Sequence, residues 1–136
     1  MNGTVLIVDE DANARIIAAA LLPLRQLHAR SATNVGEACD IAYQEDVAVV
    51  VVNLNSRTAN GFETLRQLRN RCATLRIVVV TDWEEPAVER LARRLGADAF
   101  LRQPMSPGQL TTTVENLMAI ALLPNASWVQ PLIGQG

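Results

Sequence analysis

The fold is decided by residues 47–63, which read Val-Ala-Val-Val-Val-Val-Asn-Leu-Asn-Ser-Arg-Thr-Ala-Asn-Gly-Phe-Glu. The β-branched run contains no polar residue, which predicts a central strand covered on both faces. That strand should end at Asn53, a polar side chain placed where an open α/β sheet keeps its ligand crevice, outside the carboxyl ends of its strands. After a loop, Gly61 allows a tight turn into a helix, whose apolar face is Phe62, Leu65 and Leu68. Any chemistry is therefore expected to centre on Asn53.

Length and composition limit the class of protein. The 136 residues are enough for one domain with its own core. Apolar residues make up 49%, charged residues 19%, and the net charge is −2, which excludes a disordered chain and gives no sign of a nucleic-acid face. Acidic Asp9, Glu10 and Asp11 follow the first short apolar run, unlike a signal peptide, and no apolar run approaches the roughly 20 residues of a membrane span. We expect a soluble cytoplasmic domain at 1–122 and a tail or linker stub at 123–136.

Two further features of the composition bear on chemistry. Cys39 and Cys72 lie in separate segments without metal-ligand spacing, which is typical of free thiols in a reducing cytosol. All 12 basic residues are arginine, so the chain has no lysine to offer a site.

Strand and helix patterns alternate along the chain. Strands are predicted at about 4–9, 27–31, 47–53, 76–81 and 97–102, and helices at about 12–22, 35–44 and 61–71, between Asp82 and Gly96, and from 107 to Pro124. Asp11 and Asp82 are the expected caps of the first and fourth helices. Five strands alternating with five helices predict an α/β fold, with a parallel sheet, helices on both sides and right-handed crossovers.

Polar residues stand at the carboxyl ends of the predicted strands, and in a doubly wound sheet these ends meet at one crevice. They are Asp9, Glu10, Asn53, Thr81 and, just after the last strand, Gln103. Adjacent carboxylates suit magnesium, which needs only one or two of them. They also suit a helix start, where the macrodipole favours acids. Because the other polar residues at the strand ends are expected at the same crevice, an ion site is the preferred interpretation of the acidic residues.

Over about residues 4–122 the chain resembles the receiver domain of bacterial two-component response regulators. The resemblance rests on the order and spacing of several short motifs. They are Val-Leu-Ile-Val-Asp-Glu-Asp at 5–11 with Arg15, Asn53 with Gly61 eight residues later and then Phe62-Glu63, Thr81, Gly-Ala-Asp-Ala-Phe at 96–100, and Gln103-Pro104.

The resemblance implies a flavodoxin-like doubly wound sheet with strand order 2-1-3-4-5 and five helices. It places Asn53 at the phosphoacceptor position and Gln103 at the lysine position, with Thr81 and Phe100 as the switch residues. It also implies a docking face made of the fourth helix, fifth strand and last helix. In place of the family's loop proline the chain has Arg57, and Asp82 follows the switch threonine where a small residue is usual.

The departures from the family pattern predict a pseudo-receiver without catalytic residues. A carboxamide at position 53 has no anionic oxygen to attack a phosphoryl group, so no acyl phosphate can form there. Gln103 cannot neutralise phosphoryl oxygens as a cation would. Loss of one acid and one base leaves the net charge of the pocket about unchanged. Asn53 and Gln103 are expected to hydrogen-bond to each other or to Glu10.

No cofactor is expected to be required. Magnesium could bind through Glu10, the Asn53 side-chain oxygen and the backbone carbonyl of Asn55, with Asp9 reaching it through water. Because the site has fewer carboxylates than the family pattern, that binding should be weak or absent.

The expected function is signal transduction by phosphorylation-independent protein–protein interaction, without enzyme activity. A further expectation is control of transcription through an output domain outside this sequence. The expected partner is a histidine kinase, an output domain or another receiver, and neither nucleic acid nor a membrane. A homodimer through the docking face is possible. Charged residues there could pair across the dimer or form a solvated surface; they are Glu84, Glu85, Glu89, Arg90, Arg93, Arg94 and Arg102.

Three alternatives remain open. The first is a receiver phosphorylated on Asp9 or Asp82, which in-line geometry and the missing lysine oppose. The second is a phosphohydrolase of the haloacid dehalogenase type, which the acids at 9–11 and the strand at 77–81 resemble, although that family needs a lysine and further acids. The third is a flavodoxin-like cofactor carrier, whose phosphate loop would not be acidic.

Overall fold

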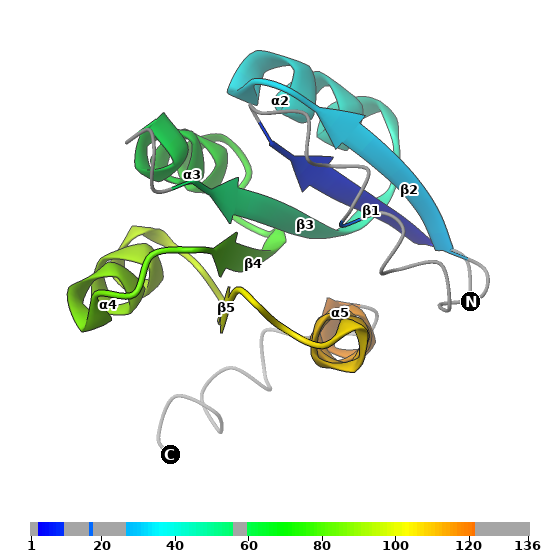
Figure 1. The fold of residues 1–136 in the computed structure, drawn as a ribbon. Helices are drawn as coiled ribbons and strands as arrows, with labels where there is room; N and C mark the ends of the chain where they lie inside the picture. The colour runs from blue at the N-terminus through cyan, green and yellow to red at the C-terminus, as the bar shows by residue number, and fades with distance from the viewer. Residues whose placement is uncertain (1–2, 10–16, 18–26, 56–59, 122–136) are drawn as a thin grey trace.

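The computed structural model describes residues 3–9, 17, 27–55 and 60–121, and it contains a five-stranded parallel sheet of order β2-β1-β3-β4-β5 (Figure 1). The strands are β1 Gly3–Val8, β2 Leu27–Ala32, β3 Val47–Leu54, β4 Arg76–Thr81 and β5 Ala99–Arg102. The predicted α/β class and the strand order 2-1-3-4-5 are confirmed.

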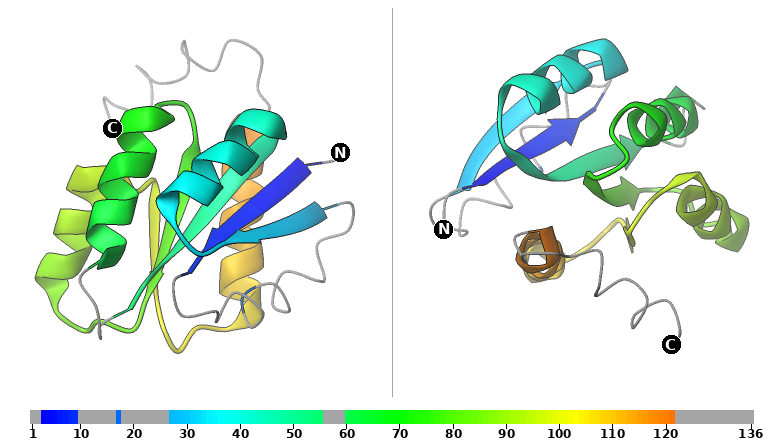
Figure 2. Two further views of the ribbon diagram at one scale, coloured as in Figure 1. Left: turned by 90° about the horizontal axis from the view of Figure 1, so that it is seen from above. Right: turned by 180° about the vertical axis from the view of Figure 1, so that it is seen from behind.

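Four helices belong to the described residues, whereas the sequence predicts five. They are α2 Val35–Gln44, α3 Asn60–Arg71, α4 Pro86–Leu95 and α5 Pro107–Ala121. Helices α2, α3 and α4 cover one face of the sheet, and α5 covers the other (Figure 2). The first predicted helix at 12–22 lies outside the described residues except for Ile17, which is helical and packs on the α5 side. Its cap Asp11 and the tail at 123–136 also lie outside them.

Strand β3 is buried on both faces, as its sequence predicts. Val50 and Val52 point to the core under α2, α3 and α4, while Val49 and Val51 point to the core under α5. Each of these side chains is at most 1% exposed. Complete burial of a valine stabilises the fold by about 1.5–3 kcal/mol, so this strand anchors both halves of the core.

Three local expectations differ from the structure. Asp82 does not cap α4, because that helix begins at Pro86 with Glu85 as its N-cap and no capping side chain; proline at the first position removes one amide that would need an acceptor. Strand β3 runs one residue beyond Asn53, because Leu54 pairs with Thr81 of β4. Strand β5 begins at Ala99 and not at Ala97.

The late start of β5 has a specific cause in Asp98. Its carboxylate Oδ2 accepts the Ile77 amide at 2.8 Å, and its own amide donates to the Ile77 carbonyl at 2.8 Å. These two bonds join a turn at Asp98 to β4 at the place where the first pairs between β4 and β5 were expected. Gly96 ends α4 as predicted, with a φ of 125° that suits glycine.

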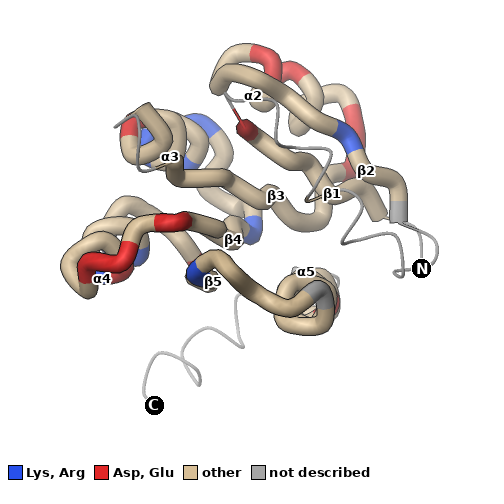
Figure 3. Tube along the Cα trace, in the orientation of Figure 1, with Lys and Arg blue, Asp and Glu red and all other residues tan. Residues whose placement is uncertain are grey.

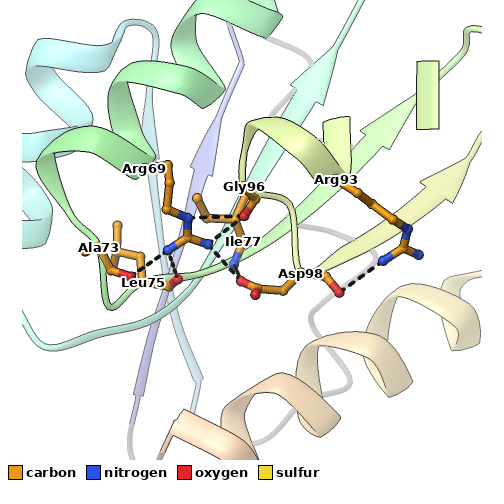
Figure 4. Close-up of polar contacts among 7 residues, drawn as sticks. All are labelled: Arg69, Ala73, Leu75, Ile77, Arg93, Gly96 and Asp98. Atoms are coloured by element: carbon orange, nitrogen blue, oxygen red, sulfur yellow. Dashed lines mark hydrogen bonds and ion pairs between the residues drawn. The ribbon is translucent and has the colours of Figure 1, made fainter. Parts of the chain in front are cut away.

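A single arginine ties α3 to the turns that precede β4 and β5 (Figure 4). The Arg69 guanidinium donates to Gly96 O at 2.6 Å and 3.2 Å, to Leu75 O at 2.7 Å and to Ala73 O at 2.9 Å. It also forms an ion pair with Asp98 at 3.0 Å. A β-carbon on Gly96 would lie 2.7 Å from the Arg69 side chain, so only glycine fits there. These contacts lie at the end of the sheet opposite the carboxyl ends of the strands.

Candidate functional site

The carboxyl ends of β1, β3 and β4 bring three predicted site residues to one edge of the sheet. Asp9 directly follows β1, Asn53 is the penultimate residue of β3, and Thr81 is the last residue of β4. Gln103 follows β5, where its backbone amide donates to the Thr81 carbonyl at 2.7 Å. Phe100 lies within β5, paired with Val79. Glu10 lies outside the described residues.

Asn53 hydrogen-bonds to Asp9 and not to Gln103. Its Nδ2 donates to Asp9 Oδ2 at 2.9 Å, and Asp9 is only 2% exposed. The expected bond between Asn53 and Gln103 is therefore wrong, because β4 separates β3 from β5, whereas β1 lies directly beside β3. The alternative, a bond to Glu10, involves a residue outside the described ranges. A buried carboxylate needs hydrogen-bond donors, and an amide donor to a charged acceptor is stronger than a neutral pair. The amide at position 53 thus satisfies the acid beside it.

Of the three side chains predicted to hold magnesium, the structure describes Asp9 and Asn53. The Asn53 side chain presents its nitrogen to Asp9, and only the oxygen of that amide could serve as a ligand for a hard cation. Within the described ranges, no three His, Cys, Asp or Glu residues come together as a metal site.

The hydroxyl of Thr81 is fully buried and engaged by backbone groups. Thr81 Oγ1 donates to Leu54 O at 2.7 Å and accepts the Trp83 amide at 3.1 Å. It thereby joins the end of β3 to the loop between β4 and α4. Movement of this hydroxyl toward the crevice would break both bonds.

Arg102 holds the same loop against β5. Its guanidinium donates to Trp83 O at 3.2 Å and to Glu85 O at 3.1 Å, and it lies 4.9 Å from the centre of the Phe100 ring. The Trp83 ring makes an edge contact with Phe62 of α3, at 6.1 Å between ring centres. The loop is therefore fixed from both sides. For Arg102 the sequence predicts an ion pair across a dimer or a solvated position and not this tether, although its spacing of two from Phe100 puts both residues on one face of the strand.

Removal of Arg102 should loosen this loop. We expect Arg102→Ala to lower the free energy of unfolding by about 1 kcal/mol, because the partly exposed guanidinium loses its carbonyl partners. Acrylamide should quench Trp83 fluorescence more strongly in this variant, measured in a Trp128→Phe background. Arg90→Ala is the matched control, since Arg90 lies in the adjacent helix α4 without a hydrogen bond to the described residues of this loop. Equal quenching in both variants would contradict the tether.

A groove of about 520 Å³ lies beside α4 and β5. It is lined by Glu84, Pro86, Glu89, Arg90, Arg93 and Arg102. Charges of both signs gather here, with acids along the loop into α4 and an arginine at β5 (Figure 3). Glu89 pairs with Arg93 at 3.0 Å and with Arg102 at 3.5 Å, so part of the charge expected to pair across a dimer is paired within the chain.

Comparison with known sequences gives a consistent result. A family model described as the response regulator receiver domain matches residues 5–115. The nitrate/nitrite response regulator protein NarL of Escherichia coli (strain K12) is 32% identical over 124 residues, covering 85% of this chain and 55% of the relative. The aerobic respiration control protein ArcA of the same strain is 24% identical over 115 residues, covering 85% and 48%. The chain thus spans about half the length of these curated relatives.

Solved structures show the same fold. The CheY-like receiver domain protein from Methanospirillum hungatei JF-1 has a TM-score of 0.74 and 19% identity, covering 89% of this chain and 97% of that one. A response regulator from Chloroflexus aurantiacus J-10-fl has a TM-score of 0.74 and 22% identity, covering 88% and 99%. At such identities the likeness concerns the fold alone.

Proposed function

The chain belongs to the response regulator receiver domain family, and from this premise we propose that it acts in two-component signalling as a pseudo-receiver that binds protein partners without being phosphorylated. The observation that carries the proposal is the hydrogen bond from Asn53 to the buried carboxylate of Asp9. An aspartate in the same place would put two carboxylates in contact, and they would repel each other unless a cation lay between them or one of them were protonated.

The chemistry of phosphoryl transfer supports the proposal. Formation of an acyl phosphate needs an anionic carboxylate oxygen that attacks phosphorus in line with the leaving group. Asn53 has no such oxygen, and its side-chain amide donates one of its two hydrogens to Asp9. Gln103 carries no charge to neutralise the phosphoryl oxygens, and the chain has no lysine to replace it. Magnesium, in this proposal, binds weakly or not at all.

The hydrogen bonds of Thr81 and of the loop after it support a domain that keeps a single conformation. Thr81 is bonded to Leu54 and Trp83, and Arg102 fixes the loop that follows. A partner would then bind by complementarity to the existing face of α4, β5 and α5, and regulation would come from a ligand that distinguishes two states. Candidate partners are a histidine kinase, an output domain or a second receiver, including a second copy of this chain.

Two further parts of the proposal concern the whole protein. The domain would work in the cytoplasm, and an output domain elsewhere in the protein would control transcription. In the part of the chain that the structure describes, no helix combines the length and apolar character of a membrane span.

Intact mass spectrometry tests the proposal. The native chain and Asn53→Asp are each incubated with magnesium and acetyl phosphate. We expect no phosphoryl adduct on the native chain, and an acid- and base-labile adduct only on the variant if its pocket retains the remaining parts. A labile adduct on the native chain would refute the proposal, and peptide mapping would then examine Asp9 and Asp82 first.

A further inference from the structure

Among the residues that the structure describes, two large apolar side chains are exposed to solvent. They are Tyr43 in α2, which is 93% exposed, and Leu91 in α4, which is 39% exposed. Single exposed apolar residues are ordinary on a protein surface. These two differ from scattered ones because the charged residues beside them on the helix surface are acidic around Tyr43 and basic around Leu91.

The exposed side of α2 is acidic. Asp40 lies three residues from both Glu37 and Tyr43, so its side chain is the neighbour of both on the helix surface, and all three residues are exposed. The helix contains no basic residue, and acidic charge alone marks it in Figure 3. In the described part of the chain neither carboxylate belongs to an ion pair, although the Thr33 hydroxyl donates to Glu37 at 3.4 Å. We call Glu37, Asp40 and Tyr43 the acidic stripe.

The exposed side of α4 is basic. Arg94 lies three residues after Leu91 and four after Arg90, so these three exposed side chains are neighbours on the helix surface. Neither of these two guanidinium groups donates to another described residue, in contrast to that of Arg93, which pairs with Glu89 at 3.0 Å. We call Arg90, Leu91 and Arg94 the basic stripe.

The two stripes cannot meet within one copy of the chain. Helix α3 lies between α2 and α4 and packs against both (Figures 1 and 2). Since packed helices lie about 8–10 Å apart, roughly 16–20 Å separate the axes of α2 and α4, which is beyond the combined reach of an arginine and an aspartate. The helix macrodipole favours acids near the start of α2 and arginines near the end of α4, but it does not favour an exposed apolar side chain beside them.

We propose that the acidic stripe of one copy binds the basic stripe of a second copy, so that the chain associates with itself through α2 and α4. The two carboxylates of one stripe then face the two guanidinium groups of the other. Tyr43 packs on Leu91 and on the methylene groups of the neighbouring arginines, which removes both exposed apolar side chains from water. A second copy is the partner because each stripe supplies one apolar side chain and two charges that complement those of the other.

The contact is expected to be weak and sensitive to salt. One helix against one helix buries less surface than the roughly 1,200 Å² at which stable interfaces begin. Exposed ion pairs add little affinity, but they orient the two copies, and salt screens them. Because the stripes are different surfaces, each copy can bind one neighbour through α2 and another through α4.

This inference goes beyond the proposed function and does not depend on it. Helix α2 is not part of the face made by α4, β5 and α5, and a phosphorylated chain would carry the same two stripes. The two surfaces can be told apart by the position at which a change of charge prevents association.

Sedimentation equilibrium at micromolar to millimolar protein concentrations tests the proposal. We expect the weight-average mass of the native chain to rise with concentration, and to return to that of a monomer when NaCl is raised from about 0.05 M to about 0.5 M. Asp40→Arg/Tyr43→Ala alters the acidic stripe, and Arg90→Glu/Arg94→Glu alters the basic stripe. Each variant should raise the dissociation constant at least about tenfold, and circular dichroism verifies that both are folded.

A mixture of the two variants is the most specific sample. Each variant retains the stripe that the other lacks, so the mixture should associate at concentrations where neither variant does so alone. Glu115→Arg is the matched control, because it makes the same change of charge on an exposed residue of α5, outside both stripes. It should associate as the native chain does.

Three results would overturn the proposal. They are a native chain that remains monomeric throughout, a mixture of the variants that remains monomeric, and an acidic-stripe variant that associates as the native chain does. In the last case, loss of association in Glu115→Arg would place the contact on the face of α4, β5 and α5 instead.

Discussion

Asn53→Asp is expected to destabilise the protein by about 2–4 kcal/mol at neutral pH without divalent cations, and magnesium is expected to restore much of the loss. The native amide donates to Asp9 at 2.9 Å, and Asp9 is 2% exposed. The substitution replaces this donor by a second negative charge at the same place. Protonation of either carboxylate would relieve the repulsion, so the stability of the variant relative to the native chain should recover as pH falls.

Chemical denaturation in EDTA and in excess magnesium measures this effect. The native chain should unfold at nearly the same denaturant concentration in both. Asn53→Ala separates the hydrogen bond from the charge, since it removes the donor without adding an acid. We expect a loss of about 1–3 kcal/mol for the alanine variant that magnesium does not restore. Equal stability of native protein and Asn53→Asp in EDTA would show that the contact between Asn53 and Asp9 does not contribute to the free energy of unfolding.

Arg69→Ala is expected to lower the free energy of unfolding by about 3–4 kcal/mol. The guanidinium donates to the carbonyls of Ala73, Leu75 and Gly96 and pairs with Asp98 (Figure 4). The Arg69 side chain is only 23% exposed, so water replaces these bonds poorly. Arg69→Lys should recover a minor part of the loss, because one ammonium group cannot reach acceptors on three sides.

Arg66→Ala is the matched control in the same helix. Arg66 hydrogen-bonds to Glu63, and this contact, with a smaller one from Gln67, holds the pKa of Glu63 at about 2. Both partners are about half exposed, so solvent screens the pair, and we expect no change in urea midpoint outside error. Similar losses in Arg66→Ala and Arg69→Ala would mean that the contacts of Arg69 contribute nothing specific.

Short-range sequence signals determined the architecture of this protein. The unbroken valines of β3 predicted burial on both faces, and the positive φ of Gly96 matches the predicted end of α4. The chemical identity of Asn53 and Gln103 already excluded an acyl phosphate and a neutralising cation at those positions, whatever their geometry. The predicted start of β5 was wrong because a tertiary contact decides it. The Asp98 carboxylate accepts the Ile77 amide, and β5 begins only after it, at Ala99.

The tertiary structure alone decided which side chains meet. Asn53 pairs with Asp9 because β1 is the neighbour of β3 and β5 is not. Arg69 bridges the turns that precede β4 and β5, which lie side by side because these two strands pair. Sequence periodicity assigns a residue to a face of a strand or helix, but the partner opposite that face depends on strand order and helix packing, which bring together residues far apart in the chain.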